Sequence, residues 1–89
     1  MQALFWVYEN YAGFFEETDT KEEFQKLLDE IHAVADEEHD FLNKLLKIGR
    51  IYHMVEDFCK KHHRRLPPTV LTSLKADLAD IIEAIPLTP

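Results

Sequence analysis

The stretch TKEEFQKLLDEIHAVADEEHDF, residues 20–41, carries the signals of one complete helix and of the start of another. Thr20 and Glu23 match the capping box, in which the threonine hydroxyl accepts the N3 amide hydrogen and the N3 glutamate accepts that of the threonine. Apolar residues then recur every three or four positions, as on one face of a helix. They are Phe24, Leu27, Leu28, Ile31, Val34 and Ala35. The pattern predicts a helix over residues 21–35.

The apolar stripe changes direction after this helix. Continuing it would require an apolar residue where Glu38 stands, whereas the next apolar residues form a stripe rotated about the helix axis. This second stripe consists of Phe41, Leu45, Ile48, Tyr52, Val55 and Cys59. Asp36 suits an N-cap, and the acids after it suit the positive end of a new helix. We therefore expect a tight turn at about residues 35–37 and a third helix over 37–63, with one uninterrupted long helix as the alternative.

The segment Leu66-Pro67-Pro68 ends the third helix, because proline lacks an amide hydrogen and restricts the residue before it. Proline also fits the first turn of a helix, so a fourth helix is expected over residues 68–85. Its inward side chains would be Val70, Leu71, Leu74, Leu78, Ile81, Ile82 and Ile85. Gly49 is the weak point of the third helix, since glycine in a helix interior costs about 1 kcal/mol relative to alanine. A kink or a close helix crossing would explain it.

The N-terminal segment holds six of the ten aromatic residues before residue 16. We expect a helix over residues 3–16, because no second strand-like run is present to pair with a strand there. Four helices in 89 residues predict an all-α, small four-helix bundle that forms a single domain, residues 1–89. Such a short chain has a modest core, so a homodimer through the aromatic N-terminal helix is a further expectation.

Cysteine usage and hydropathy indicate where the protein resides. Cys59 is the only cysteine, so no intramolecular disulfide can form, and the cytoplasm is the expected compartment. The apolar N-terminal segment contains Glu9 and Asn10 and is too short to span about 30 Å of hydrocarbon as a helix. No membrane segment is therefore expected.

Opposite charges are sorted along the chain. Residues 1–43 carry a net charge of −10 and residues 44–66 carry +5, within a total of −7. We expect the folded chain to show a largely negative flank that steers association with a basic protein. The expected acidic contacts are Glu16, Glu17, Glu22, Asp29, Glu37, Glu38 and Asp40. Trp6 and Tyr8 would be the aromatic anchors of the contact.

The run of Lys60, Lys61, Arg64 and Arg65, interleaved with two histidines, has two interpretations. Cations in the last turn of a helix interact favourably with the negative end of its dipole. We expect this helix-end role, with part of the run pairing with the acidic second helix. The alternative is a nucleic-acid-binding regulator in which these four residues bind phosphate, an interpretation that the negative charge of residues 1–43 opposes.

Two histidine-containing groups have partial metal-site spacings. His32, Asp36 and His39 would share a face only if the second and third helices were continuous, and the group Cys59-x-x-His62-His63 lacks a second pair of ligands. We therefore expect neither a metal nor another cofactor.

The acidic pairs Asp19-x-x-Glu22 and Glu37-x-x-Asp40 resemble those with which all-helical pyrophosphohydrolases of the MazG type hold magnesium. The resemblance implies a Mg-dependent nucleotide pyrophosphohydrolase. Both pairs, however, fall where the N-termini of helices favour acids, and capping is sufficient to explain them. No other catalytic motif is present, so we expect a protein that is not an enzyme.

The segment TKEEFQKLLDEI, residues 20–31, resembles the first helix of the nuclease-colicin immunity proteins, which are small, acidic and four-helical. Their Asp-Leu-Ile-Tyr-Tyr-Pro segment is absent, so no binding residue is carried over. The resemblance implies a style of function. Together with the charge pattern, it favours a small acidic helical protein-binding module, of the inhibitor, immunity or antagonist type, acting on a basic partner such as a nucleic-acid-processing protein.

Overall fold

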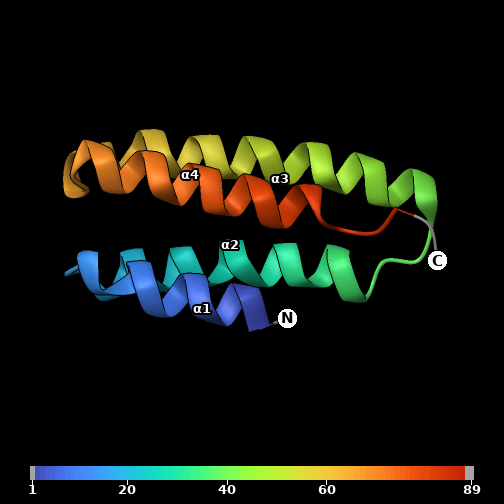
Figure 1. The fold of residues 1–89 in the computed structure, drawn as a ribbon, viewed down its shortest axis with the longest axis horizontal. Helices are drawn as coiled ribbons and strands as arrows, with labels where there is room; N and C mark the ends of the chain where they lie inside the picture. Colours follow the sequence, from blue (N-terminus) through green and yellow to red (C-terminus); the bar gives the residue numbers. More distant parts are fainter. Residues whose placement is uncertain (1, 88–89) are drawn as a thin grey trace.

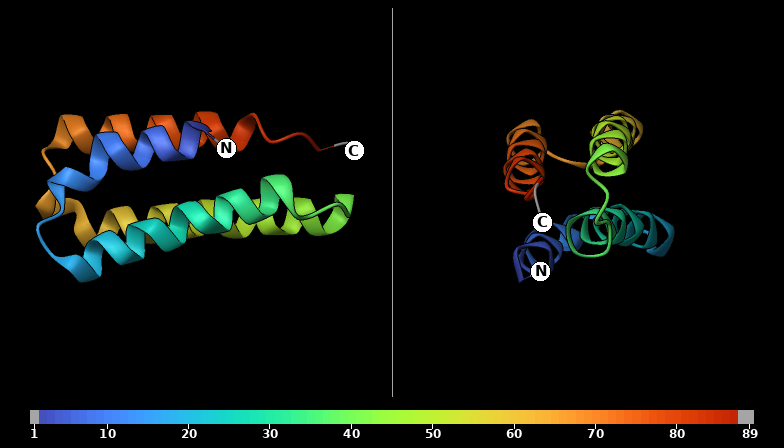
Figure 2. Two further views of the ribbon diagram at one scale, coloured as in Figure 1. Left: turned by 90° about the horizontal axis from the view of Figure 1, so that it is seen from below. Right: turned by 90° about the vertical axis from the view of Figure 1, so that its right-hand side faces the viewer.

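Residues 2–87 are described by the computed structural model, and they form four α-helices that run alternately up and down (Figure 1). The helices are α1 (Gln2–Tyr11), α2 (Thr18–Asp36), α3 (Phe41–His62) and α4 (Pro68–Glu83). Short 3-10 turns, Ala12–Phe14 and His63–Arg65, follow α1 and α3. The prediction of an all-α four-helix bundle is confirmed. Seen from its end, the bundle is square, with α1 diagonally opposite α3 (Figure 2).

The core is centred on three phenylalanines from different parts of the chain. The ring centroid of Phe15 lies 5.4 Å from that of Phe24 and 5.6 Å from that of Phe58, and Phe24 stacks on Phe58 at 5.6 Å. Rings at these separations gain from edge and offset contacts in addition to burial. The aliphatic residues of the stripes predicted for the second and fourth helices surround them, so the 3.6-residue period identified the inward side chains of α2 and α4.

The predicted capping box at Thr20 is wrong. Helix α2 begins two residues earlier, at Thr18, and its extended N-cap residue is Glu17, whose side chain caps no amide. Thr20 therefore lies inside the first turn and is buried, and its hydroxyl accepts a hydrogen bond from Nη1 of Arg65 at 3.3 Å. The Thr20 hydroxyl, which the sequence motif predicted to cap the helix, instead makes a tertiary contact with Arg65.

The break between α2 and α3 is confirmed, which excludes one continuous helix. The helix ends at Asp36, where the amides of Glu37 and Glu38 both donate to the carbonyl of Ala33, at 2.9 and 3.1 Å. The prediction of Asp36 as the next N-cap is wrong, because α3 begins at Phe41. Its N-cap is Asp40, which accepts a hydrogen bond from the amide of Asn43 at 3.0 Å.

The helices have very different lengths. At about 1.5 Å per residue, α3 is about 33 Å long, α4 about 24 Å and α1 about 15 Å. Neither α1, at its N-terminal end, nor α4, at its C-terminal end, extends as far as the beginning of α3 (Figure 1). The second stripe is therefore buried only in its last part, at Val55 and Cys59, whereas Phe41, Leu45 and Tyr52 are all at least 40% exposed.

Candidate functional site

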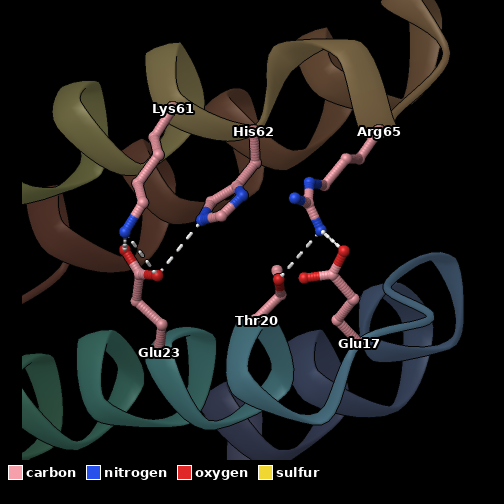
Figure 3. Close-up of polar contacts among 6 residues, drawn as sticks. All are labelled: Glu17, Thr20, Glu23, Lys61, His62 and Arg65. Atoms are coloured by element: carbon pink, nitrogen blue, oxygen red, sulfur yellow. Dashed lines mark hydrogen bonds and ion pairs between the residues drawn. The ribbon is translucent and has the colours of Figure 1, made fainter.

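The basic run at the end of α3 is held against the beginning of α2 (Figure 3). Nζ of Lys61 lies 3.2 Å from Oε2 of Glu23, and Nη1 of Arg65 lies 2.8 Å from Oε1 of Glu17. The prediction that part of the run pairs with the acidic second helix is confirmed. Two of the four cations proposed to bind phosphate are thus occupied within the chain.

His62 is buried between this ion pair and the aromatic core. Its Nε2 hydrogen bonds Oε2 of Glu23 at 3.2 Å, and its ring centroid lies 4.7 Å from that of Phe58. Partial burial acts to raise the pKa of Glu23, but hydrogen bonds from Lys61 and His62 outweigh it, so this pKa lies below its ordinary value. Nδ1 of His62 has no hydrogen-bond partner among residues 2–87. Glu23 is therefore the hydrogen-bond acceptor that offsets the free-energy cost of burying the His62 ring.

Two further ion pairs continue along the α2–α3 edge. Arg50 Nη2 lies 3.3 Å from Oε2 of Glu30, and the ammonium of Lys47 hydrogen bonds Glu38. The hydrogen bond from Lys47, and a second from the amide of Asp40, lower the pKa of Glu38. The basic third helix thus neutralises part of the expected negative flank. Its cations pair with Glu17, Glu23, Glu30 and Glu38.

The acids predicted to contact a partner do not form a single surface. Glu16 and Glu17 precede α2, whereas Glu37, Glu38 and Asp40 follow it, and α2 itself is about 28 Å long. Glu22 and Asp29 are exposed seven residues apart, two turns along one face of α2. Of these seven acids, Asp29 lines a groove together with Phe5 and Tyr8 of α1, and Glu16 and Glu17 line another with Phe14, which follows α1.

The outer edge of α1 exposes two large aromatic side chains, Phe5 at 68% and Trp6 at 61%. Phe5 borders a groove of about 320 Å³ between α1 and α2. The groove is lined by Leu4, Phe5, Tyr8, Glu9, Gln25, Leu28, Asp29 and His32. Tyr8, predicted to be an anchor, is half-buried and stacks on Phe24, with centroids 6.0 Å apart. It forms part of the groove wall, whereas Phe5 and Trp6 project.

The charge of this groove is negative. Glu9 forms no ion pair with any residue of the range 2–87, and Asp29 accepts a hydrogen bond only from the neutral Gln25, at 2.8 Å. A second groove of similar volume separates α1 from α4 and contains Trp6 and Asp77. There Asp77 accepts a hydrogen bond from Tyr11, and burial together with this bond raises the pKa of Tyr11 to about 12. Both sides of α1 therefore combine aromatic surface with carboxylates.

A second apolar surface, the α3 face, lies on the first three turns of α3 and was missed in the sequence. It consists of Phe41, Leu42, Leu45, Leu46, Gly49 and Tyr52. Leu42 and Leu46 are the most exposed of these large side chains, at 68% and 73%. A usable signal was present, because these two leucines lie off the stripe that periodicity assigns to the core.

The potential metal and catalytic groups are separated by the fold. Within the described part of the chain, no three His, Cys, Asp or Glu side chains gather closely enough to hold a metal ion. His32 pairs with Asp36 at 2.9 Å, whereas His39 lies beyond the end of α2. Burial raises the pKa of the Cys59 thiol. The magnesium-type acidic pairs, Asp19 with Glu22 and Glu37 with Asp40, lie at opposite ends of α2.

Comparisons with known proteins complete the description of the site. No family model matches the sequence, and the comparisons with curated proteins and with solved structures found no match. The resemblances to immunity proteins and to pyrophosphohydrolases of the MazG type therefore stay predictions. None of the helices within residues 2–87 combines the length and apolar composition needed to cross a membrane.

Proposed function

We propose that this chain is a protein-binding module that docks onto a basic protein through α1 and the groove between α1 and α2. The observation that supports the proposal is that exposed Phe5 borders a groove carrying the unneutralised carboxylates of Glu9 and Asp29. Exposed Trp6 lies next to Phe5 on α1 and borders the groove that contains Asp77. Large aromatic side chains are frequent energetic anchors of protein interfaces, and complementary charge selects the partner and speeds association. The occupant that fits is an apolar segment flanked by lysine or arginine.

The consequence of such binding would be inhibition of the partner. An acidic module that covers the basic surface of a nucleic-acid-processing protein competes with nucleic acid for that surface, as an immunity-type antagonist would. The net charge of −7 favours encounters with such a partner at low salt. The single buried cysteine is compatible with a reducing, cytoplasmic setting. The alternative of direct nucleic-acid binding has less support, because Lys61 and Arg65 pair with carboxylates of the same chain.

The only tryptophan of the chain lies at the proposed site, so its fluorescence tests the proposal directly. The probe is a synthetic amphipathic helix with leucine on one face and lysine on the other, compared with the same peptide carrying glutamate for lysine. We expect the lysine peptide to shift Trp6 emission to shorter wavelength and the glutamate peptide to leave it unchanged. Equal responses to both peptides would contradict the proposal.

A pair of charge reversals separates a local site from the effect of overall charge. Replacing Glu9 and Asp29 by lysine is expected to weaken binding of the lysine peptide at least about tenfold. The matched control replaces Glu56 and Glu83, exposed acids of α3 and α4, by lysine, which makes the same change in net charge. If both double variants lose affinity equally, the groove is not the binding site.

A further inference from the structure

The α3 face is a second interaction surface with a different chemical character from the groove. From Phe41 to Tyr52 it presents leucines, aromatic rings and one glycine, and it contains no Asp, Glu, Lys, Arg or His. The cations of the same segment lie elsewhere, since Lys44 is buried, Arg50 pairs with Glu30 of α2 and Lys47 pairs with Glu38, which follows α2. The α3 face therefore offers contact area but no charge with which to select a basic partner.

The net charge limits which surfaces two copies of this chain can bring together. Each copy carries −7, so contacts that place carboxylates opposite carboxylates are repulsive. The groove beside α1 contains Glu9 and Asp29 and is unsuitable for pairing with itself. The uncharged α3 face carries no such penalty, and the ion pairs beside it remain within each copy.

Gly49, in the middle of the α3 face, is not required by the fold of a single chain. Its φ is not positive, and a Cβ built on it meets no atom within 4 Å. Alanine would therefore fit and would favour the helix more than glycine does. What glycine provides is bare backbone on an exposed apolar face, where a side chain of another molecule can approach closely.

We propose that the α3 face binds the α3 face of a second copy, with the two α3 helices antiparallel about a twofold axis between Leu45 and Leu46. This axis places Leu42 of each copy opposite Gly49 of the other, and Leu45 opposite Leu46. A twofold interface is self-complementary, so one apolar face is sufficient to form it. Because α1 is diagonally opposite α3, each copy in the dimer keeps its α1 edge open to solvent (Figure 2).

Sedimentation velocity of the full chain tests this pairing. The α3 face is about 18 Å long, so we expect its pairing to bury an area at the small end of the range for protein interfaces. The association would then be weak, and we expect the weight-average mass to rise from that of one chain to that of two between about 10 µM and about 1 mM. A single-chain mass throughout this range would overturn the proposal.

A pair of variants identifies the surface used. Leu46→Glu places a carboxylate in the α3 face without disturbing the core, and we expect it to remain a single chain at every concentration. The control, Phe5→Glu, makes the same chemical change on α1 and is expected to dimerise as the original chain does. Circular dichroism confirms that both variants fold. Dimerisation of Leu46→Glu, or its loss in Phe5→Glu, would place the interface elsewhere and refute the proposal.

Gly49→Ala provides a readout in which stability and association change in opposite directions. In dilute solution the variant is expected to melt at a higher temperature, because alanine favours the helix. The added methyl would meet Leu42 of the second copy, so we expect the dissociation constant of the dimer to rise at least about fivefold. Unchanged dimerisation would show that Gly49 is not at the contact. The peptide-binding test of the α1 groove is independent of this outcome, so either proposal can fail alone.

Discussion

The two halves of α3 have the same share of apolar residues but are buried to very different extents. In residues 51–62, Ile51, Val55, Phe58, Cys59 and His62 are buried. In residues 41–50 the only buried side chain is that of Lys44, although this half contains three leucines, one isoleucine and one phenylalanine. The difference shows that the burial of an apolar helical face depends on how far the neighbouring helices extend along it. Neither α1 nor α4 reaches the first turns of α3.

The polar contacts differ in the same way. In the second half of α3, the ion pair between Glu23 and Lys61 includes buried His62 and adjoins the packed phenylalanines. In the first half, the pairs of Lys47 with Glu38 and of Arg50 with Glu30 are at the surface. We therefore assign the second half to stability and the first half to association.

The largest expected contrast between the halves comes from removing one apolar side chain from each. Phe58→Ala is expected to cost about 3–5 kcal/mol, because it removes the ring that contacts both Phe15 and Phe24. Leu46→Ala is expected to change stability by less than about 0.5 kcal/mol in dilute solution. Urea unfolding measures both changes. Because the alanine variant of Phe58 would be largely unfolded, Phe58→Leu, with an expected loss of about 1–2 kcal/mol, extends the series. Comparable losses in the two halves would remove the distinction.

The next contrast concerns the acids that pair with α3. Glu23→Ala leaves buried His62 without its acceptor, and the expected cost is about 1–3 kcal/mol. Glu30→Ala removes an exposed pair with Arg50 and is expected to cost at most about 1 kcal/mol. Thermal or urea unfolding of the two variants at neutral pH gives the difference. A larger loss for Glu30→Ala would contradict the structural assignment of the two pairs.

A smaller effect, opposite in sign, is expected from the glycine of the first half. Gly49→Ala should raise the free energy of unfolding by about 1 kcal/mol when it is measured in dilute solution, since nothing in the chain obstructs a methyl group there. Urea unfolding at low protein concentration makes this measurement. A loss of stability would mean that the fold of a single chain requires glycine at position 49. Gly49 would then give no support to a contact with a second copy.

The smallest expected effects appear in acid. The pKa values of Glu23 and Glu38 lie below the ordinary value of 4.5, so the unfolded chain binds protons more readily than the folded chain as the pH falls. Their contribution to stability is present above about pH 4.5 and is lost as the pH falls through the folded pKa values. Glu23→Gln is expected to flatten the dependence of stability on pH between about 3 and 5. Parallel curves for the original chain and the variant would exclude this role for Glu23.

The sequence predicted those features of the fold that depend on short-range pattern. Recurrence of apolar residues every three or four positions located α2, α3 and α4, the two prolines ended α3, and the change of stripe separated α2 from α3, whereas α1 was predicted from the lack of a pairing strand. Helix starts were less predictable, because Thr20 and Asp36 are both good capping residues in isolation. The structure uses Glu17 and Asp40 as N-caps instead. Local capping preferences of about 1 kcal/mol are readily overridden by tertiary contacts such as that between Thr20 and Arg65.

The candidate sites were less accessible to sequence reasoning than the helices were. The charge pattern implied internal pairing, but no sequence spacing indicates that Arg65 meets Glu17, 48 positions earlier. The aromatic surplus of the N-terminal segment was visible, and Trp6 is exposed as an anchor should be, whereas Tyr8 packs on Phe24. The α3 face was overlooked although Leu42 and Leu46 lie off the predicted stripe, and periodicity alone could not show that Phe41, Leu45 and Tyr52 of the stripe stay uncovered.

The most direct test of the contrast within α3 is hydrogen exchange of its amides at two protein concentrations. We predict that amides of residues 45–50 exchange much more slowly at about 1 mM than at about 10 µM, because a second copy covers them, and that they slow more than those of residues 51–62, which gain only from the higher stability of the dimer. Exchange of residues 45–50 that does not depend on concentration would contradict the division of α3 into a stabilising half and an associating half.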